Sequence, residues 1–260
     1  MKIPTFCALA IVLGSTTVSA QATEPGRFGV SVEGLMVWQQ RNDVRIPPKT
    51  GTPFSIVDLI GSAGTPSVRT EATVALNDRQ ELRFVHAPLR VTGQGTATAP
   101  ISFADGLFQP GPTDAEFMFN SYRGTWRYRV HQGPTWTWQV GATAFIRDAR
   151  ISLTQPGRYA KDANVGFVPL GHIAGKARIN DRWHVGLELD GTAAPQGRAF
   201  DFSGTLNYRP TPKVTLSAGY RTVEGGADVN KVYTFAWLNA VVGKVGGRLD
   251  RKSTRLNSSH

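Results

Sequence analysis

Few side chains in this sequence have the types and spacing that catalysis needs. The histidines before the C-terminal tail are His86, His131, His172 and His184. Only His172 is a candidate for proton transfer, and no serine can be assigned to it as a nucleophile. Metal-ligand spacings, glycine-rich phosphate loops and catalytic motifs are absent from the sequence. The sequence therefore predicts a protein that is not an enzyme, with no catalytic residue, no metal and no cofactor.

Charged residues at alternating positions are the more informative group. Arg123, Arg127 and Arg129 occupy alternate positions of one predicted strand, so their side chains share a face. Buried charges must be paired or hydrated, which favours a salt-bridged polar core. A narrow pore whose arginine excess prefers anions is the alternative. The residues predicted to line this polar interior are Glu33, Arg69, Glu71, Arg83, Arg123, Arg127, Arg129, Arg147, Lys176, Arg178, Glu188, Asp190, Asp201 and Arg221.

These charges lie on long alternating strands, of which residues 116–150 are the clearest example. The segment predicts two strands joined by a tight turn at residues 131–134. On the second strand, apolar residues from Trp136 to Ile146 alternate with small and polar residues from Thr135 to Thr143. Long strands with one apolar face, one polar face and aromatic residues at one level are typical of a lipid-facing β-barrel.

The same unit repeats along the chain and predicts ten strands, with eight to twelve possible. Short connections follow the even-numbered strands, whereas the long connections, 41–66 and 92–115, follow odd-numbered ones. An even count returns the last strand to the first and leaves no open edge. The fold class predicted for residues 21–249 is therefore an all-β, closed antiparallel transmembrane β-barrel. A soluble barrel with its apolar face turned inward around a ligand is the alternative.

Two local features refine this prediction. In the third strand Leu89 and Val91 carry the apolar face onward in the opposite phase after Pro88, which predicts a bulge there. Aromatic residues gather near the short turns, where a transmembrane barrel needs an interfacial girdle. The residues predicted for this girdle are Trp126, Tyr128, Trp136, Trp138, Trp183 and Tyr208.

The first long connection contains the signals of a short helix over residues 52–61. Thr52 would cap it, Pro53 would take its first position and Gly61 would follow its end. Phe54, Val57 and Ile60, with Ile56, would give it an apolar side. We expect this helix to plug the barrel mouth; contact with lipid or a ligand at the outer surface is the alternative.

Both ends of the chain are expected to lie outside the barrel. Residues 1–20 have the positive start, apolar run and small-residue cleavage site of a signal peptide. The only cysteine, Cys7, lies within that segment. Residues 250–260 resemble the translation of a sequencing adapter, and we expect the native C-terminal sequence to be missing. The formal net charge of +10 is then better explained by a charged barrel interior and an anionic lipid surface than by nucleic acid.

Over residues 27–249 the chain resembles the small outer-membrane β-barrel proteins of Gram-negative bacteria, in pattern rather than in a specific motif. The resemblance implies Sec-type export, residence in the outer membrane, and contact with outer-membrane lipid such as lipopolysaccharide and with the barrel assembly machinery. Omptin proteases of this class use paired aspartates and an Asp–His pair at the outer rim, and lipid A deacylases use a His–Ser pair. No Asp-x-Asp or Asp-x-His motif occurs here near an extracellular strand end.

The function predicted from the sequence is a non-enzymatic outer-membrane barrel with a charged, largely filled lumen and extracellular loops for surface interaction. A small anion-preferring, porin-like pore is the first alternative. An outer-membrane enzyme acting on lipid or peptide is the second.

Overall fold

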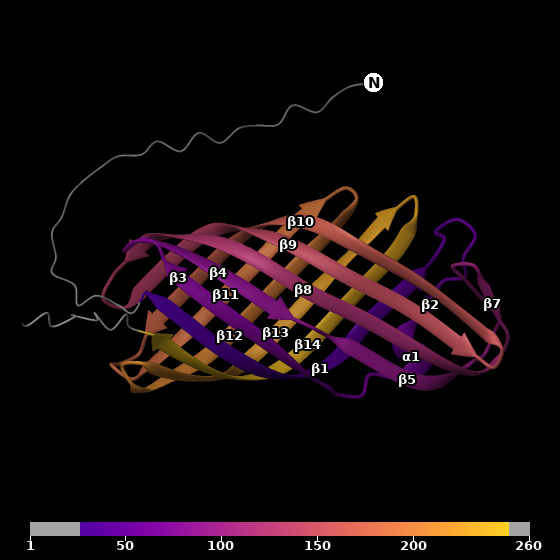
Figure 1. Cartoon of the computed structure of the whole chain (residues 1–260), viewed down its shortest axis with the longest axis horizontal. Helices are drawn as coiled ribbons and strands as arrows, with labels where there is room; N and C mark the ends of the chain where they lie inside the picture. The colour runs from indigo at the N-terminus through magenta and orange to yellow at the C-terminus, as the bar shows by residue number, and fades with distance from the viewer. Residues whose placement is uncertain (1–26, 250–260) are drawn as a thin grey trace, which may run out of the picture.

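The computed structural model describes residues 27–249, which form a closed β-barrel (Figure 1). The predicted signal peptide and the predicted non-native tail lie outside these residues. The elements are β1 (Phe28–Arg45), β2 (Phe54–Ser55), α1 (Ile56–Ile60), β3 (Thr65–Ala75), β4 (Gln80–Ala87), β5 (Arg90–Ala97), β6 (Ile101–Phe103), β7 (Gly106–Phe108), β8 (Gly111–Gln132), β9 (Trp136–Gln155), β10 (Arg158–Arg178), β11 (Trp183–Ala194), β12 (Gly197–Thr211), β13 (Val214–Val229) and β14 (Val232–Leu249).

Within this range ten antiparallel strand positions close the ring. β4 and β5 share one position, because both pair with β8. β14 closes the barrel on β1, with a ladder that runs from Phe28 opposite Leu249 to Arg45 opposite Tyr233. The predicted closed barrel of ten strands is confirmed.

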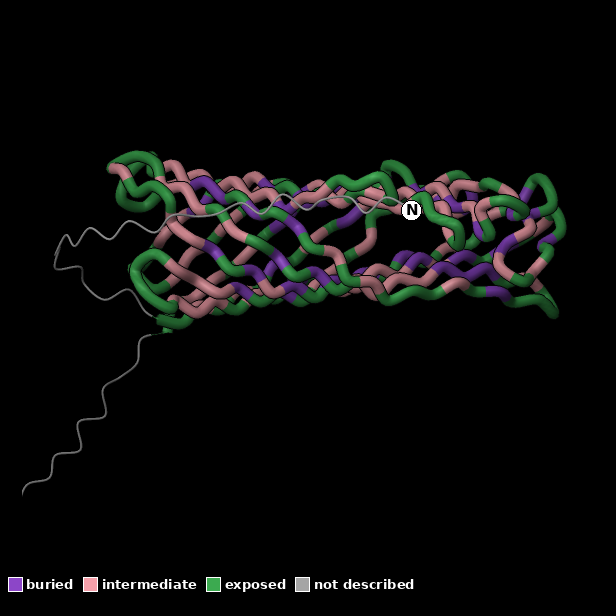
Figure 2. The backbone as a smooth tube through the Cα atoms, turned by 90° about the horizontal axis from the view of Figure 1, so that it is seen from above, coloured by how far each residue is buried: buried purple, intermediate pink, exposed green. Residues whose placement is uncertain are grey.

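Alternation along the strands decides which side chains face outward. Buried and exposed residues alternate along much of the wall (Figure 2). Val30, Phe84, Val140 and Leu206 are all exposed on the outer surface. An exterior covered by large apolar side chains suits hydrocarbon and is too apolar for water. The alternative of a soluble barrel with its apolar face inward is therefore wrong.

The interruption of the wall at Pro88 is not the bulge that the sequence predicted. Ala87 on β4 pairs with Ser121, and Arg90 on β5 pairs with Met118, so three residues advance on both strands and the register is unchanged. Leu89 and Val91 are buried inside the barrel. At this point the residues of the inner face change from polar to apolar. In the sequence this change has the same pattern as a shift of the apolar residues to the other face.

The connections distinguish the two ends of the barrel. Phe28, Leu249 and the turn between β3 and β4 lie at one end (Figure 1). In barrels of this class the end with the chain termini and short turns faces the periplasm. The opposite, extracellular end carries β2, α1 and the β6–β7 hairpin, together with the extended ends of β8, β9 and β10.

The helix in the first connection is shorter than predicted and turned differently. Ser55, not Thr52, caps it by accepting a hydrogen bond from the Asp58 backbone N–H at 3.2 Å. Its buried residues are Ile56 and Leu59, whereas Phe54 and Ile60 are only partly buried. Val57, also predicted for the apolar side, is likewise only partly buried.

α1 packs against the inside of the wall rather than over the mouth. It contacts β1 and β5, and at Gly95 an added Cβ would lie 1.5 Å from the Leu59 carbonyl oxygen. Only glycine permits that approach. The helix therefore fills the interior beside the place where β3 has ended and only the two-residue β2 pairs with the edge of β1 that β3 has left. No helix within residues 27–249 has the length and apolar character needed to cross a membrane.

Candidate functional site: the barrel lumen

Arg83 lies at the centre of an ion-pair network across the middle of the lumen. Its side chain is fully buried. It contacts Glu188 at 2.9 Å and Asp190 at 3.0 Å, and it donates to the Thr125 hydroxyl at 3.3 Å. β4 supplies the arginine and β11 supplies both carboxylates, so the network joins strands that are not neighbours in the ring.

The extracellular side of this network is built around Asp201. Its carboxylate accepts a hydrogen bond from Arg221 at 2.6 Å and forms an ion pair with Arg123 at 2.6 Å. The Arg69 guanidinium lies 3.7 Å away. Glu33 adds a second acid, 3.3 Å from Arg221. One carboxylate thus ties β12 to its neighbour β13 and to β3 and β8, which are distant from it in sequence.

The periplasmic side of the network continues the same alternation of charge. Arg127 bridges Glu81 at 3.2 Å and Glu188 at 3.0 Å. Lys244 pairs with Glu71 at 3.3 Å. The complete network contains six basic side chains and six carboxylates, namely Arg69, Arg83, Arg123, Arg127, Arg221 and Lys244 with Glu33, Glu71, Glu81, Glu188, Asp190 and Asp201.

This balance decides what the network can do electrostatically. Equal numbers of opposite charges leave no net charge in the narrowest part of the lumen. Each buried guanidinium is matched by carboxylates at short range, which offsets the cost of removing it from water. The ion pairs of the network join strands across the lumen, and these twelve side chains offer no excess of positive charge to attract an anion.

His172 belongs to this network. Its Nδ1 lies 2.7 Å from Asp190 Oδ1, and its Nε2 is buried without a hydrogen-bond partner. The same carboxylate also binds Arg83, Arg123 and the Thr143 hydroxyl. His172 lines neither of the two large lumen cavities described below. The histidine thus has a carboxylate within reach, but in the middle of the barrel and not at the extracellular mouth where substrate could approach.

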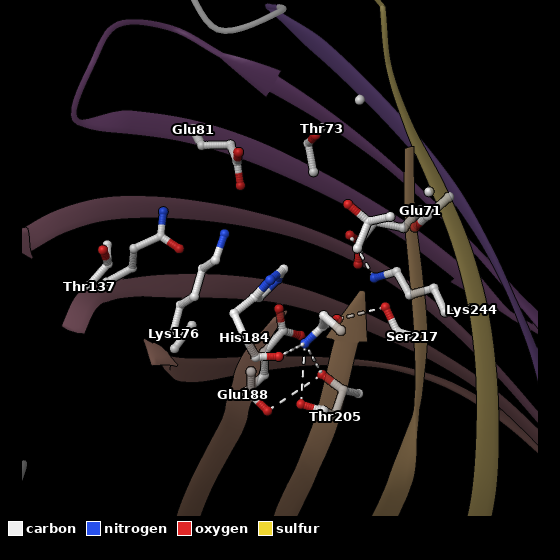
Figure 3. A pocket seen from close by; sticks show the side chains of 18 of the residues that line it. Glu71, Thr73, Glu81, Thr137, Lys176, His184, Glu188, Thr205, Ser217 and Lys244 are labelled. Atoms are coloured by element: carbon white, nitrogen blue, oxygen red, sulfur yellow. Dashed lines mark hydrogen bonds and ion pairs between the residues drawn. The ribbon is translucent and has the colours of Figure 1, made fainter. Parts of the chain in front are cut away.

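Below the network the lumen opens into a periplasmic cavity of about 530 Å³ (Figure 3). Glu71, Glu81 and Glu188 lie on its network side, with hydroxyl and amide groups such as those of Thr205, Asn207 and Ser217 around them. Asn207 donates to the Thr205 hydroxyl at 3.0 Å and accepts from Ser217 at 2.6 Å. The cavity has a polar wall suited to water or a polar solute.

The mouth of this cavity has cations without acidic partners. Lys176, Arg209 and Arg248 line it, and none of them forms an ion pair within residues 27–249. The charged groups that act on Lys176 are Arg209, Arg248 and Arg129, all of the same sign. Figure 3 shows Lys176 and His184 on the side of the cavity away from the Lys244–Glu71 pair. Positive charge is therefore unbalanced in this cluster.

Above the network the inward side chains become apolar. Phe117, Phe145, Leu170 and Leu238 are buried there, and the Arg123 guanidinium lies 4.7 Å from the centre of the Phe145 ring. Phe117 and Leu238 belong to one hydrophobic cluster with the buried side chains of α1 and of the β6–β7 hairpin. A second cavity, of about 350 Å³, lies beside it. The lumen therefore has a polar half and an apolar half with the ion-pair network between them.

The fourteen residues predicted to line the lumen do not all belong to the network. Arg129, Lys176 and Arg178 lie at the periplasmic rim, where Arg178 pairs with the exposed Asp181. Arg147 lies in the extracellular half and donates to Asn164 at 3.1 Å. The other ten lie in the network, as Glu33, Arg69, Glu71, Arg83, Arg123, Arg127, Glu188, Asp190, Asp201 and Arg221.

The sequence missed some members of this site. Lys244 was not singled out, because the alternation of its strand is irregular at Leu238 and Asn239. The structure explains that irregularity: opposite this place β1 has a bulge between Gln39 and Arg41, whereas the pairing of β14 with β13 is uninterrupted. A count of positions from the Lys231 end would have placed Lys244 on the inner face.

The six aromatic residues predicted for an interfacial girdle lie in pairs beside the periplasmic turns. Trp136 stacks on Trp138 with ring centres 5.4 Å apart. The other two pairs are Trp126 with Tyr128 at 6.3 Å and Trp183 with Tyr208 at 4.8 Å. Rings with an apolar body and a polar tip favour the boundary between lipid and water.

Comparison with known proteins identifies the fold. The sequence matches no protein-family model and no curated protein. The outer membrane protease OmpT from Escherichia coli aligns over 90% of this chain and 99% of its own, with a TM-score of 0.51 and 9% identity. Neisserial surface protein A aligns over 87% and 99%, with a TM-score of 0.38 and 16% identity. Ail, the attachment invasion locus protein of Yersinia pestis, aligns over 85% and 99%, with a TM-score of 0.38 and 9% identity.

At such low identity the likeness to OmpT shows the fold and carries no information about activity. The chain has the outer-membrane β-barrel fold that the sequence predicted. This fold and the apolar exterior together place the protein in the bacterial outer membrane. Within residues 27–249 no group of histidine, cysteine, aspartate and glutamate side chains could hold a metal ion.

Proposed function

We propose that this protein is a non-enzymatic outer-membrane β-barrel with a closed lumen, whose extracellular end binds a partner outside the cell. The observation that carries the proposal is the balanced ion-pair network, in which six cations meet six carboxylates across the middle of the barrel. The two large cavities lie on opposite sides of it. A continuous anion path through the narrowest section would have to break several of these pairs.

The extracellular end supports the binding part of the proposal. The β6–β7 hairpin and α1 rest on a continuous hydrophobic cluster, so their outer surfaces are held on a firm base. Leu107 of the β6–β7 hairpin and Tyr159 at the start of β10 are exposed at the same end of the barrel. Loops fixed on a rigid scaffold and carrying exposed apolar side chains are typical of protein-binding surfaces.

The surroundings of His172 support the non-enzymatic part. The side chain is buried, and the hydroxyl nearest to it in the network, that of Thr143, donates to Asp190 at 2.7 Å instead of to the histidine. A nucleophile needs a base within hydrogen-bond reach and a space for the reacting group. His172 lacks both.

Conductance across a planar bilayer tests the closed lumen. The mature protein, refolded into lipid, should give no steady conductance steps under conditions in which a porin conducts in the same bilayer. Steady anion-selective steps would contradict the proposal and would support the pore.

A second candidate function rests on the unbalanced cations at the periplasmic mouth. Lys176, Arg209 and Arg248 could bind a small periplasmic anion without letting it cross the network. Titration calorimetry with inorganic pyrophosphate tests this candidate. We expect saturable binding to the unmodified barrel and at least a tenfold weaker affinity for the Lys176→Gln, Arg209→Gln double variant. The Arg178→Gln variant is the control, because Arg178 is already paired with Asp181. Equal binding by all three proteins would refute this candidate.

A further inference from the structure

One edge of β10 is unpaired over half of its length. β10 pairs with β9 from Arg158 to Ala177, but it pairs with β11 only from Gly171 to Arg178. From residue 158 to residue 170 the edge that faces β11 has no strand beside it. In Figure 1 the β9–β10 hairpin runs on to the far right of the barrel, whereas the β11–β12 hairpin ends well short of it. The wall therefore has a gap between β10 and the β11–β12 hairpin.

The lower part of this gap lies at the level of the apolar exterior. Phe167 on β10 pairs with Ile146, the last outward apolar residue of β9 before Asp148. Phe167 is 66% exposed and Val165 is 69% exposed, which are the highest values among the large apolar side chains of the described chain. Residues 167–170 of the unpaired edge are thus surrounded by hydrocarbon. Open sheet edges are not tolerated in lipid, and irregular backbone occurs at this depth only where it is buried in protein or lines a water-filled cavity.

A cavity does lie behind the gap. The 350 Å³ extracellular cavity is lined by residues 166–170 of β10 and by residues 197–201 of β12. Its lining includes the outward Phe167 and Phe200 as well as the inward Phe119 and Phe145. Because residues of both faces of the wall line one cavity, the cavity reaches the wall at this gap. Its volume is at the low end of the range, about 300–1,000 Å³, that is typical of ligand pockets.

The chemistry of the cavity changes from apolar walls to a charged floor and rim. Arg123 and Asp201 of the ion-pair network form its floor, so nothing that enters can continue toward the periplasm. Arg147 lies in its lining with Asn164 as its hydrogen-bond partner and no carboxylate contact. Its Nε is buried without a partner. A positive group with unused donors above an apolar chamber suits an amphiphile with an anionic headgroup.

A second gap in the same wall is filled by a segment of the protein itself. Between β1 and β5, where β3 has ended, the protein supplies its own filling: Leu59 and Ile60 of α1 pack against β5. No segment within residues 27–249 fills the gap beside β10. Since that gap opens onto the lipid-facing surface, hydrocarbon is the material in contact with it.

We propose that the gap between β10 and the β11–β12 hairpin is a lateral portal through which the acyl chain of an anionic membrane lipid enters the extracellular cavity. The acyl chain of this lipid packs against Phe119, Phe145 and Leu170, and the phosphate of its headgroup binds the Arg147 guanidinium. This lipid site goes beyond the proposed function, since a barrel can be closed to ions with or without it.

Photo-crosslinking tests the proposal. The photoreactive residue p-benzoylphenylalanine replaces Phe145 in one variant, the buried Phe103 in a second and the lipid-facing Phe84 in a third. Each is refolded into vesicles of phosphatidylcholine and phosphatidylglycerol, with folding verified by heat-dependent migration on gels. We expect lipid adducts at positions 145 and 84 and none at position 103, which is buried but does not line the cavity. Adducts only to protein at position 145 would overturn the proposal.

Two further variants test the entry route of the lipid and the contact of its headgroup with Arg147. Ala199→Trp places a bulky ring in the portal, and the yield of lipid adduct at position 145 should fall at least fivefold while that at position 84 is unchanged. Arg147→Gln should abolish the preference for phosphatidylglycerol over phosphatidylcholine in the adducts. An unchanged yield with Ala199→Trp would mean that lipid does not enter between these strands, and an unchanged preference with Arg147→Gln would refute the headgroup contact.

Discussion

The two halves of the lumen are built by the same strands with opposite chemistry. On β8, Arg123 and Arg127 face the polar half, and Ala115 and Phe117 face the apolar half, all at alternate positions. In the polar half, stability depends on matched charges that join opposite walls. In the apolar half it depends on side chains that fill space, including those of α1. The comparison teaches that alternation determines which side chains point inward, but not what the interior is made of.

The largest expected loss of stability comes from removing an arginine of the ion-pair network. Arg83→Ala leaves Glu188 and Asp190 short of a buried partner, which should lower the free energy of unfolding by about 3–5 kcal/mol. Urea unfolding of the protein in lipid vesicles, followed by tryptophan fluorescence, measures this change. Arg178→Ala is the matched control, because its ion pair is exposed, and it should unfold at an unchanged urea midpoint. Similar midpoints for the two variants would mean that the network does not stabilise the barrel.

A smaller effect is expected from the apolar half. Leu59→Ala removes a buried side chain of α1 and should cost about 2 kcal/mol, at the low end of the range for such truncations because the short helix can settle inward. The same unfolding experiment applies. Val57→Ala, on the less buried side of the helix, should cost less. If Val57→Ala were the more damaging of the two, the orientation of α1 described here would be wrong.

The smallest effect on stability is expected at the periplasmic mouth, where charge is unbalanced. Removing a positive charge by Lys176→Gln relieves repulsion from Arg209 and Arg248 and should leave the barrel equally stable or slightly more stable. The midpoint of urea unfolding at low salt is the appropriate measurement, because salt screens such repulsion. A clear loss of stability would show that Lys176 has an attractive partner in the folded barrel.

Much of the fold follows from local pattern. The ten strands, their faces and the periplasmic turns are all visible in the alternation, because a lipid-facing wall must be apolar on one side at every second residue. The inward direction of Arg83, Arg123 and Glu188 follows from the same rule. The helix at residues 56–60 was found in approximately the right place from its terminal glycine, Gly61, although its cap and buried face were not.

The alternation of residues along the strands does not predict which other side chain each inward side chain contacts. Arg83 and Asp190 are more than a hundred residues apart in sequence, and only the curvature of the closed ring places them face to face. The apolar half was missed for the same reason: Leu89 and Val91 look like outer-face residues until the unchanged register against β8 turns them inward.

By itself, the sequence determined that these strands have a lipid-facing side and a charged inner side, since hydrocarbon accepts only one kind of surface and each strand must meet that demand locally. Only the tertiary structure decided that the charges cancel, that α1 fills one gap in the wall, and that the gap beside β10 remains open. Those outcomes depend on the lengths of neighbouring strands and on their register around the ring, and no single strand encodes either.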